Sequence, residues 1–255
     1  MKSFIKYKDF LDEKARYYES PDFIKDDPVS IIHNFQAKND IEISGFMTAT
    51  ISWGRRKSII KCAKKIIELM ENSPYDFIIN HERKDLDRFN SFVYRTFNSI
   101  DIKFFMESLK NIYKFHNGLE NLFSKSEKEL SLLNNISNFK KIFFEIKHEK
   151  RTTKHISDPK MGSASKRLNM FLRWMVRSPK NGVDMGIWKK IKPSDLSCPL
   201  DVHSGNIARK LNLITRKNND IKALEELDIN LRKLDNNDPV KYDFALFGLG
   251  IYEGF

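Results

Sequence analysis

Apolar residues recur at intervals of three and four along most of this 255-residue chain, and that period predicts helices rather than strands. Polar caps and breakers set the expected bounds: Asn39-Asp40 begins one helix, Ser52-Trp53-Gly54 breaks it, and Asn72-Ser73-Pro74 ends the next. The expected helices cover residues 28–35, 39–51, 55–71, 101–113, 119–133, 139–148, 163–177, 185–190, 202–213, 220–234 and 239–248. The pattern therefore predicts an all-α fold.

One region is less regular than the rest. Residues 76–100 are mixed, and within them residues 92–97 fit either a short extended piece or another helix. We find no internal repeat and no low-complexity linker. A hydrophobic content of 40%, with 20 phenylalanines, is enough to build a core, so disorder is not the expected state.

The cysteines and the lengths of the apolar runs indicate in which compartment the chain works. Cys62 and Cys198 lie far apart in the sequence, which indicates reduced thiols in a cytoplasmic protein and excludes a four-cysteine metal or iron–sulfur site. No stretch approaches 18 uncharged apolar residues, and residues 1–8 are too charged for a signal peptide. We therefore expect no membrane partner.

A formal net charge of +11 changes this picture, because such a field attracts polyanions. A basic charge balance is the electrostatic footprint of a nucleic-acid-binding protein, so the charge favours nucleic acid as a partner. The alternative is a compositional bias, since the chain is rich in Lys, Asn, Ile and Phe and such drift raises the lysine content without a purpose.

Two segments carry candidate chemistry. Lys166 follows Gly162-Ser163-Ala164-Ser165 and begins an apolar helix, where partial burial and the positive end of the helix dipole disfavour an ammonium and favour a nucleophilic amine. Asp201 precedes another helix, whose first N–H groups keep a capping carboxylate ionised. The plainer interpretations are a lysine that contacts phosphate or solvent and an aspartate that only caps its helix.

These segments resemble the helix-hairpin-helix DNA glycosylase superfamily of endonuclease III and 8-oxoguanine glycosylase. Residues 162–166 are similar to its hairpin turn and catalytic lysine, and Pro199-Leu200-Asp201-Val202-His203 is similar to its Pro-Val-Asp-x-His segment. Residues 46–65 and 239–248 resemble its first lobe and its closing helix. The chain is also similar to a bacterial family without an assigned activity.

The resemblance implies a two-lobed fold, with residues 31–176 in one lobe and residues 1–30 and 177–255 in the other. It implies a base-excision repair glycosylase that acts on duplex DNA as a monomer, without a metal or other cofactor. Lys166 would form an imine with the sugar, assisted by Asp201, and β-elimination would then cleave the strand. The similarity of the Pro-Leu-Asp-Val-His motif favours an oxidised base as the substrate, with 8-oxoguanine as the first choice.

The resemblance also implies residues that contact DNA. Trp53 lies at the helix break, where the superfamily presents a wedge; it fits equally a core residue that closes the turn. Phe244 and Phe247 would line a base pocket, although phenylalanines in a helical stripe are more often core. The expected contacts to the DNA backbone are Lys160, Gly162, Ser163, Ser165, Arg55 and Arg56.

The hairpin departs from the family pattern. Where the family has Leu-Pro-Gly-x-Gly, this chain has Lys160-Met161-Gly162-Ser163-Ala164. Ala164 replaces a glycine that lets the backbone approach a phosphate closely. The alternative is therefore a non-enzymatic DNA- or RNA-binding protein on the same scaffold. Catalysis requires that the Lys166 amine and an Asp201 oxygen converge where solvent reaches them, whereas mere binding does not.

Overall fold

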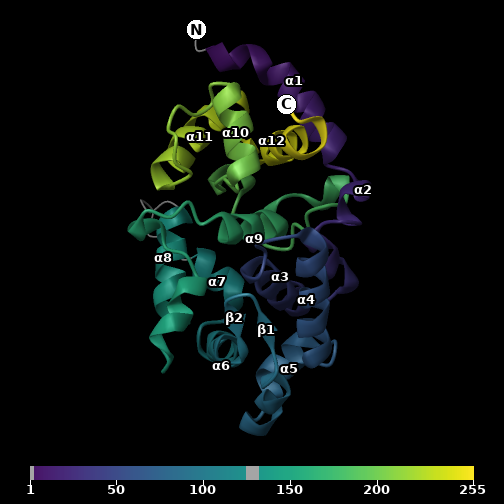
Figure 1. Ribbon diagram of the computed structural model, residues 1–255, viewed down its shortest axis with the longest axis vertical. Coiled ribbons are helices and arrows are strands. Elements are labelled where there is room, and N and C mark those ends of the chain that lie inside the picture. Colours follow the sequence, from purple (N-terminus) through teal and green to yellow (C-terminus); the bar gives the residue numbers. More distant parts are fainter. Residues whose placement is uncertain (1–2, 125–131) are drawn as a thin grey trace. The chain divides into compact units, whose positions relative to one another are not determined.

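The computed structural model describes residues 3–124 and 132–255, and most of them lie in helices (Figure 1). The predicted all-α fold is confirmed. In this part of the chain the paired strands are β1 (Val93–Tyr94) and β2 (Phe97–Asn98), which form an antiparallel hairpin. Residues 92–97 thus adopt the extended alternative, because Arg95 takes a left-handed φ of 55° and turns the chain back after β1.

The chain divides into two compact units. Unit 1 comprises Met1–Ile24, Ser131–Asn134 and Asp158–Phe255, and unit 2 comprises Lys25–Leu130 and Asn135–Ser157. This division differs from the predicted lobes, which placed the Lys166 helix with residues 31–165. The helix lies in unit 1 because Ile221 N donates to Gly162 O over 3.0 Å and because Ala164 joins the apolar core of the C-terminal helices.

Unit 2 has an aromatic core. Phe105 lies with its ring centroid 4.7 Å from that of Phe143, and Phe123 lies 4.4 Å from Phe139. Such ring pairs add to the stabilisation that burial already gives. The helices of unit 2 are α3 (Lys38–Thr50), α4 (Arg56–Leu69), α5 (Pro74–Asn80), α6 (Ser99–Phe115), α7 (Gly118–Ser124) and most of α8 (Leu132–Phe143), with a 3-10 turn at Pro28–Asn34 before them.

Several predicted helices of unit 2 are confirmed within two residues, among them 39–51 and 55–71. The predicted helix at 101–113 begins earlier, because Asn98 caps it: its side chain accepts from Ile100 N and Asp101 N. The predicted helix at 119–133 lies partly outside the described residues. The predicted helix at 139–148 instead ends at Phe143, within α8.

Unit 1 packs its helices around a second apolar core. They are α1 (Lys8–Tyr18), α2 (Pro21–Ile24), α9 (Lys166–Val176), α10 (Val202–Lys210), α11 (Ile221–Leu234) and α12 (Tyr242–Gly248). In Figure 1, α12 lies beside α1 and α10, and its contacts with both are extensive. The approach of α1 is close enough that a Cβ at Gly248 would clash with the Tyr18 ring.

The predicted helix at 185–190 is wrong. Gly186 has a φ of 57°, and the segment instead pairs with the end of α9: Met185 N donates to Trp174 O and Trp188 N to Met175 O. Its backbone donors are therefore satisfied by α9 rather than by turns of its own.

Candidate functional site

Lys166 is delivered by a tight turn that ends where α9 begins. Asp158 accepts from Lys160 N over 3.0 Å, and Gly162 takes a left-handed φ of 87°. Ser165 is also left-handed, with a φ of 47°, and Lys166 is the next residue. The turn is held in place because the backbone of Ser163 bridges to Asp220 at the start of α11.

Asp201 is delivered by a capped helix start. One of its oxygens, Oδ1, accepts from His203 N over 2.8 Å and from Ser204 N over 3.0 Å. Ser204 Oγ accepts in return from Asp201 N over 2.9 Å, which completes a capping box. The capping function thus uses Oδ1 and holds the carboxylate in one orientation.

The Lys166 amine and the Asp201 carboxylate lie close together within unit 1. Lys166 Nζ lies 3.8 Å from Asp201 Oδ2, the oxygen that the cap leaves aside. The side chains are 30% and 23% exposed, so both reach solvent. Lys166 Nζ also lies 3.8 Å from Met170 Sδ, one turn further along α9. The structure therefore brings the predicted nucleophile and its predicted carboxylate partner together at an accessible point.

The segment that leads to Asp201 is fixed by long-range hydrogen bonds. It has no regular structure, yet residues 196–200 are buried. From α11, Arg232 Nη2 donates to Leu196 O over 2.8 Å, and Asp228 Oδ1 accepts from Cys198 N over 3.0 Å. Asn219 Nδ2 donates to Asp201 O over 2.7 Å. These contacts are typical of a site whose geometry is set before a ligand arrives.

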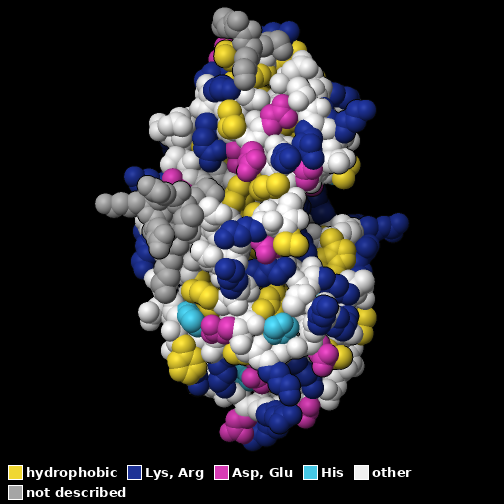
Figure 2. Space-filling model, turned by 90° about the vertical axis from the view of Figure 1, so that its left-hand side faces the viewer, with side chains coloured by type: hydrophobic (Ala, Val, Ile, Leu, Met, Phe, Trp, Pro, Cys, Tyr) yellow, Lys and Arg dark blue, Asp and Glu magenta, His cyan; other side chains and the backbone are white. Residues whose placement is uncertain are grey.

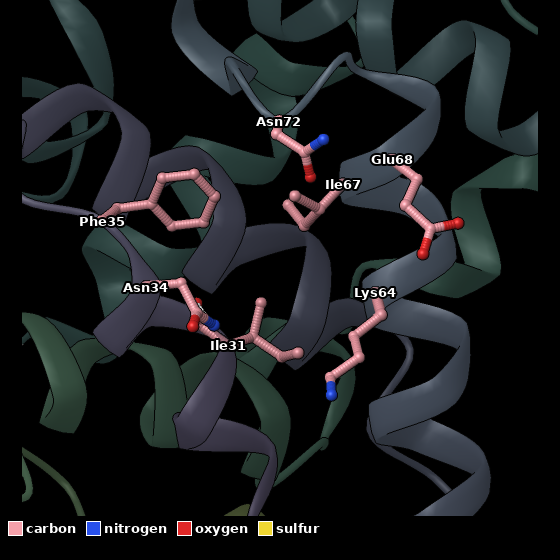
Figure 3. Close-up of a pocket in the computed structure, with 7 residues that line it drawn as sticks. All are labelled: Ile31, Asn34, Phe35, Lys64, Ile67, Glu68 and Asn72. Atoms are coloured by element: carbon pink, nitrogen blue, oxygen red, sulfur yellow. Dashed lines mark hydrogen bonds between the residues drawn. The ribbon is translucent and has the colours of Figure 1, made fainter.

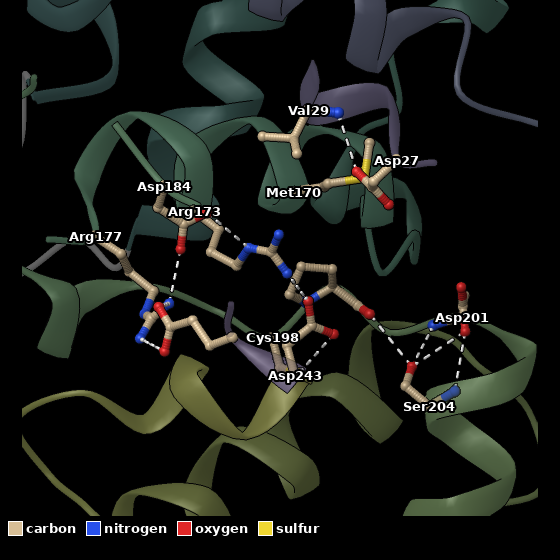
Figure 4. A network of polar contacts seen from close by, with 12 residues as sticks. Asp27, Val29, Met170, Arg173, Arg177, Asp184, Cys198, Asp201, Ser204 and Asp243 are labelled. Atoms are coloured by element: carbon tan, nitrogen blue, oxygen red, sulfur yellow. Dashed lines mark hydrogen bonds and ion pairs between the residues drawn. The ribbon is translucent and has the colours of Figure 1, made fainter. Parts of the chain in front are cut away.

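A buried ionic network lies further along α9 (Figure 4). Arg173 pairs with Asp184 and Asp243, and Arg177 pairs with Glu19, Asp184 and Asp238. Two guanidinium groups thus face four carboxyl groups. Burial raises the pKa of Asp243 to about 6 against the opposing effect of Arg173, and it also raises the pKa of Asp184.

Cys198 borders this network, in a position that disfavours its thiolate. Its Sγ lies 3.9 Å from Asp243 Oδ1, and the residue is fully buried. Burial and the nearby carboxylates raise the pKa of the thiol well above its usual range, so the thiolate is disfavoured.

The residues of the hairpin turn that are predicted to contact DNA differ in their exposure to solvent. Lys160 and Gly162 are exposed, Met161 between them is 84% exposed, and Ser163 is partly buried. Ser165 is different: it is 2% exposed, and its hydroxyl has no hydrogen-bond partner among the described residues. The prediction that its side chain contacts DNA is wrong, because the left-handed turn directs the residue into the protein.

The residues predicted from the first lobe lie in unit 2. Trp53 is partly buried; its ring lies edge-on to Tyr94, with centroids 5.4 Å apart, and stacks on His155. Arg55 is the exposed cap residue before α4, and Arg56 begins that helix. Trp53 thus packs in the helix turn with part of its ring accessible, which leaves both of its predicted interpretations open.

The predicted base-pocket residues lie in and beside the core of unit 1. Phe244 is 1% exposed and packs under Arg173, whose guanidinium carbon lies 4.3 Å from the ring centroid. Phe247 is partly buried, with its ring 6.0 Å from that of Phe23. Phe244 therefore fits the core interpretation, whereas Phe247 keeps an accessible edge.

Basic side chains on the face drawn in Figure 2 do not gather into one patch. Figure 2 shows lysine and arginine side chains spread over the face that it draws, with acidic side chains among them. In residues 3–124 and 132–255 no group of three or more His, Cys, Asp or Glu is placed to hold a metal ion. Within the same residues, no helix has both the length and the apolar character needed to span a bilayer.

Sequence reasoning missed Arg173, Asp243 and Asn219. Arg173 lies seven residues after Lys166, between the apolar runs Met170-Phe171-Leu172 and Trp174-Met175-Val176, and this was a usable signal for a buried cation. Asp243 and Asn219 gave no local signal, because their partners lie 70 and 18 residues away.

The site is thus an amine–carboxylate pair held at two adjacent helix starts of a helical protein. The chain belongs to the DUF2400 family, whose model matches residues 27–252 and is described as a protein of unknown function. No curated protein and no solved structure matches the chain.

Proposed function

We propose that this protein is a DNA glycosylase with a lysine nucleophile, built on the helix-hairpin-helix glycosylase plan. The observation that carries the proposal is the 3.8 Å separation of Lys166 Nζ and Asp201 Oδ2, with both side chains partly exposed. An amine beside a fixed carboxylate is the pair that attack on a sugar carbon requires. The hairpin turn before Lys166, with exposed Lys160 and Gly162, supports a duplex DNA substrate.

The chemistry assigns one role to each member of the pair. Asp201 Oδ2 accepts a proton from the Lys166 ammonium, and the amine then donates its electron pair to C1′ of the damaged nucleotide. The bond between C1′ and the base breaks, and the departing base takes the electron pair and the proton held by Asp201, which becomes a carboxylate again. Opening of the sugar at O4′, with proton transfer from nitrogen to O4′, gives an imine.

The imine has two fates. Hydrolysis releases an abasic site and restores Lys166. Loss of a C2′ proton expels the 3′-phosphate and cleaves the strand by β-elimination. While positive charge develops on the sugar, the Asp201 carboxylate stabilises it, because its orientation is already fixed by the capping hydrogen bonds.

The substrate class follows from the resemblance of residues 199–203, which favours an oxidised purine such as 8-oxoguanine in duplex DNA. In this proposal Trp53 fills the space left by the flipped nucleotide, and Arg55 and Arg56 contact phosphates. Phe247 contributes its accessible edge to the base pocket. The protein acts as a monomer in the cytoplasm.

The test is reductive trapping with borohydride. Purified protein is incubated with duplex DNA that carries 8-oxoguanine, and separately with an abasic-site duplex. We expect a covalent adduct with the wild type and none with Lys166→Gln. Lys217→Gln is the control: it removes an exposed lysine of unit 1 that lies outside the turn, and it should retain the adduct. No adduct on either duplex, despite DNA binding, would overturn the proposal.

The alternative, a DNA- or RNA-binding protein without catalysis, is favoured by one observation. Ala164 is 6% exposed and packs in the core of unit 1, so the turn lacks the second glycine that would let a phosphate approach the backbone. In that case the Lys166–Asp201 pair would only stabilise the turn. The trapping experiment separates the two functions, since only the enzyme forms an adduct.

A further inference from the structure

A pocket separate from the Lys166–Asp201 site lies in unit 2, between the 3-10 turn Pro28–Asn34 and the last turns of α4 (Figure 3). Its volume of about 350 Å³ is within the range of pockets that bind small ligands. Its lining residues are Ile31, Asn34, Phe35, Lys64, Ile67, Glu68 and Asn72. No residue of the proposed catalytic pair belongs to it.

The apolar part of this pocket has the shape of a slot. Ile31 and Ile67 are buried, and Phe35 is half-buried. Figure 3 shows Phe35 and Ile67 on opposite sides, with the Asn72 carboxamide near the gap between them. Such a slot suits a flat ring, which would pack against the phenylalanine and the branched side chain.

The polar side chains of the pocket keep unused hydrogen-bonding capacity. Asn34 Nδ2 donates to Ser30 O and Ile31 O, each over 3.1 Å, which leaves its Oδ1 as an acceptor toward a ligand. Among the described residues, the side chains of Lys64, Glu68 and Asn72 make no hydrogen bond or ion pair. An amine, a carboxylate and a carboxamide, all on exposed residues, thus lie at the rim of this pocket.

Asn72 is placed by an unusual turn. Glu71 and Asn72 both adopt left-handed backbone, with φ of 59° and 56°. Arg88 holds this turn, since its Nη1 donates to Glu71 Oε1 over 2.8 Å and to Leu69 O over 3.1 Å. These two residues end α4, where Asn72 N donates to Ile67 O over 3.0 Å, and this termination fixes the position from which the Asn72 side chain extends.

We propose that this pocket binds an adenine nucleotide. The base lies between Phe35 and Ile67, and the Asn72 carboxamide pairs with N6 and N7 of adenine, as asparagine does when it reads that edge in DNA. Lys64 contacts the 5′-phosphate, and Glu68 accepts a hydrogen bond from a sugar hydroxyl.

The charged residues of the pocket lie one turn apart on the same helix. Lys64 and Glu68 lie four residues apart on α4, about 5–6 Å between their Cβ atoms, and they form no ion pair. In the proposed complex a phosphate pairs with Lys64 and a sugar hydroxyl donates to Glu68, so one ligand satisfies both side chains. The nucleotide could be free or could end a DNA strand, because both present the same chemistry.

The test is calorimetric titration of the full chain with AMP. Lys64→Ala should weaken AMP binding about tenfold and leave adenosine binding unchanged, since only AMP carries the phosphate. Asn72→Gly should weaken both about tenfold; glycine accepts the left-handed backbone, so the fold is kept. Lys65→Ala, the neighbouring exposed lysine outside the pocket, and Lys166→Gln should bind AMP as the wild type does.

The source of the nucleotide is settled by competition with a single-stranded oligonucleotide that begins with 5′-phosphorylated adenosine. Displacement of AMP that is lost in Lys64→Ala assigns a strand end, and failure to displace AMP assigns the free nucleotide. Either result supports the proposal. No AMP binding, or binding that neither Lys64→Ala nor Asn72→Gly weakens, would overturn it.

Discussion

Two groups of charged side chains on α9 differ in their surroundings. At its first turn, Lys166 faces Asp201 and both side chains reach solvent. At its end, Arg173 and Arg177 have side chains only 5% exposed and are enclosed by carboxyl groups. A buried pair that loses one partner leaves an uncompensated charge, whereas an exposed pair does not. We infer that the inner network, formed by Arg173, Arg177 and their carboxylate partners, stabilises the fold. The outer pair, Lys166 and Asp201, is available for catalysis.

The largest effect that separates these roles is expected at Asp201. Asn caps helices about as well as Asp, so Asp201→Asn removes the charge but keeps the cap. We expect the rate of adduct formation to fall by about 10²- to 10⁴-fold, the range for one acid–base group. The unfolding free energy, from urea titration, should change by less than about 0.5 kcal/mol. A large loss of stability with an unchanged rate would reverse the assigned roles.

The opposite outcome is expected in the inner network. Arg173→Met leaves Asp184 and Asp243 buried without that cation and should lower the unfolding free energy by about 3–5 kcal/mol. Urea denaturation at pH 7 measures this. The matched control is Arg216→Met, which breaks the more exposed pair with Asp220 and should leave the transition near that of the wild type. Equal effects of the two substitutions would remove the contrast.

The pH dependence of the unfolding free energy tests the role of Asp243 in the buried network. Its pKa is raised to about 6 from 3.8, so between these pH values the folded state holds a proton that the unfolded chain has lost. Stability from this group is therefore greatest at low pH and is lost as the pH rises from about 4 to about 6. The loss should be on the order of 1–3 kcal/mol in the unfolding free energy.

Asp243→Asn removes this titration, so the urea midpoint of the variant should vary less than that of the wild type between pH 4.5 and pH 7. Asp220→Asn is the control, because the pKa of Asp220 is lowered to about 2 by Arg216 and it titrates below that interval. If the stability of the wild type and of both variants rises with pH to the same extent, the result contradicts the raised pKa of Asp243.

The smallest effect is expected at Asn219, which holds the backbone of Asp201 through its 2.7 Å hydrogen bond. Asn219→Ala should slow adduct formation by about tenfold and cost about 1–2 kcal/mol of unfolding free energy, because it also removes the hydrogen bond that Asn219 Oδ1 accepts from Arg209 Nη2 over 2.6 Å. Asn206→Ala, on the exposed side of α10, is the control and should change neither quantity. If Asn219→Ala leaves the rate unaltered, the carbonyl contact does not position the carboxylate.

The sequence was informative where local rules decide the structure. The apolar period and the breakers after α3 and α4 placed both helices, although the predicted cap Asn39-Asp40 lies inside α3, whose first residue is Lys38. The turn before Lys166 and the cap at Asp201 are encoded within a few residues. It was uninformative where partners are distant, as for Arg173 and Asp243. Ser165 shows how local reasoning fails: its place in the hairpin suggested a DNA contact, but its backbone conformation, which the sequence does not reveal, buries the side chain.

The most direct test of the central claim is to identify the residue that carries the trapped sugar. The chain has 45 lysines and arginines, so an adduct alone does not assign the nucleophile. The borohydride adduct with the abasic-site duplex should be digested with protease and nuclease and mapped by mass spectrometry. We predict the sugar remnant on Lys166. A remnant on Lys160 or any other lysine, with Lys166 unmodified, would contradict the account.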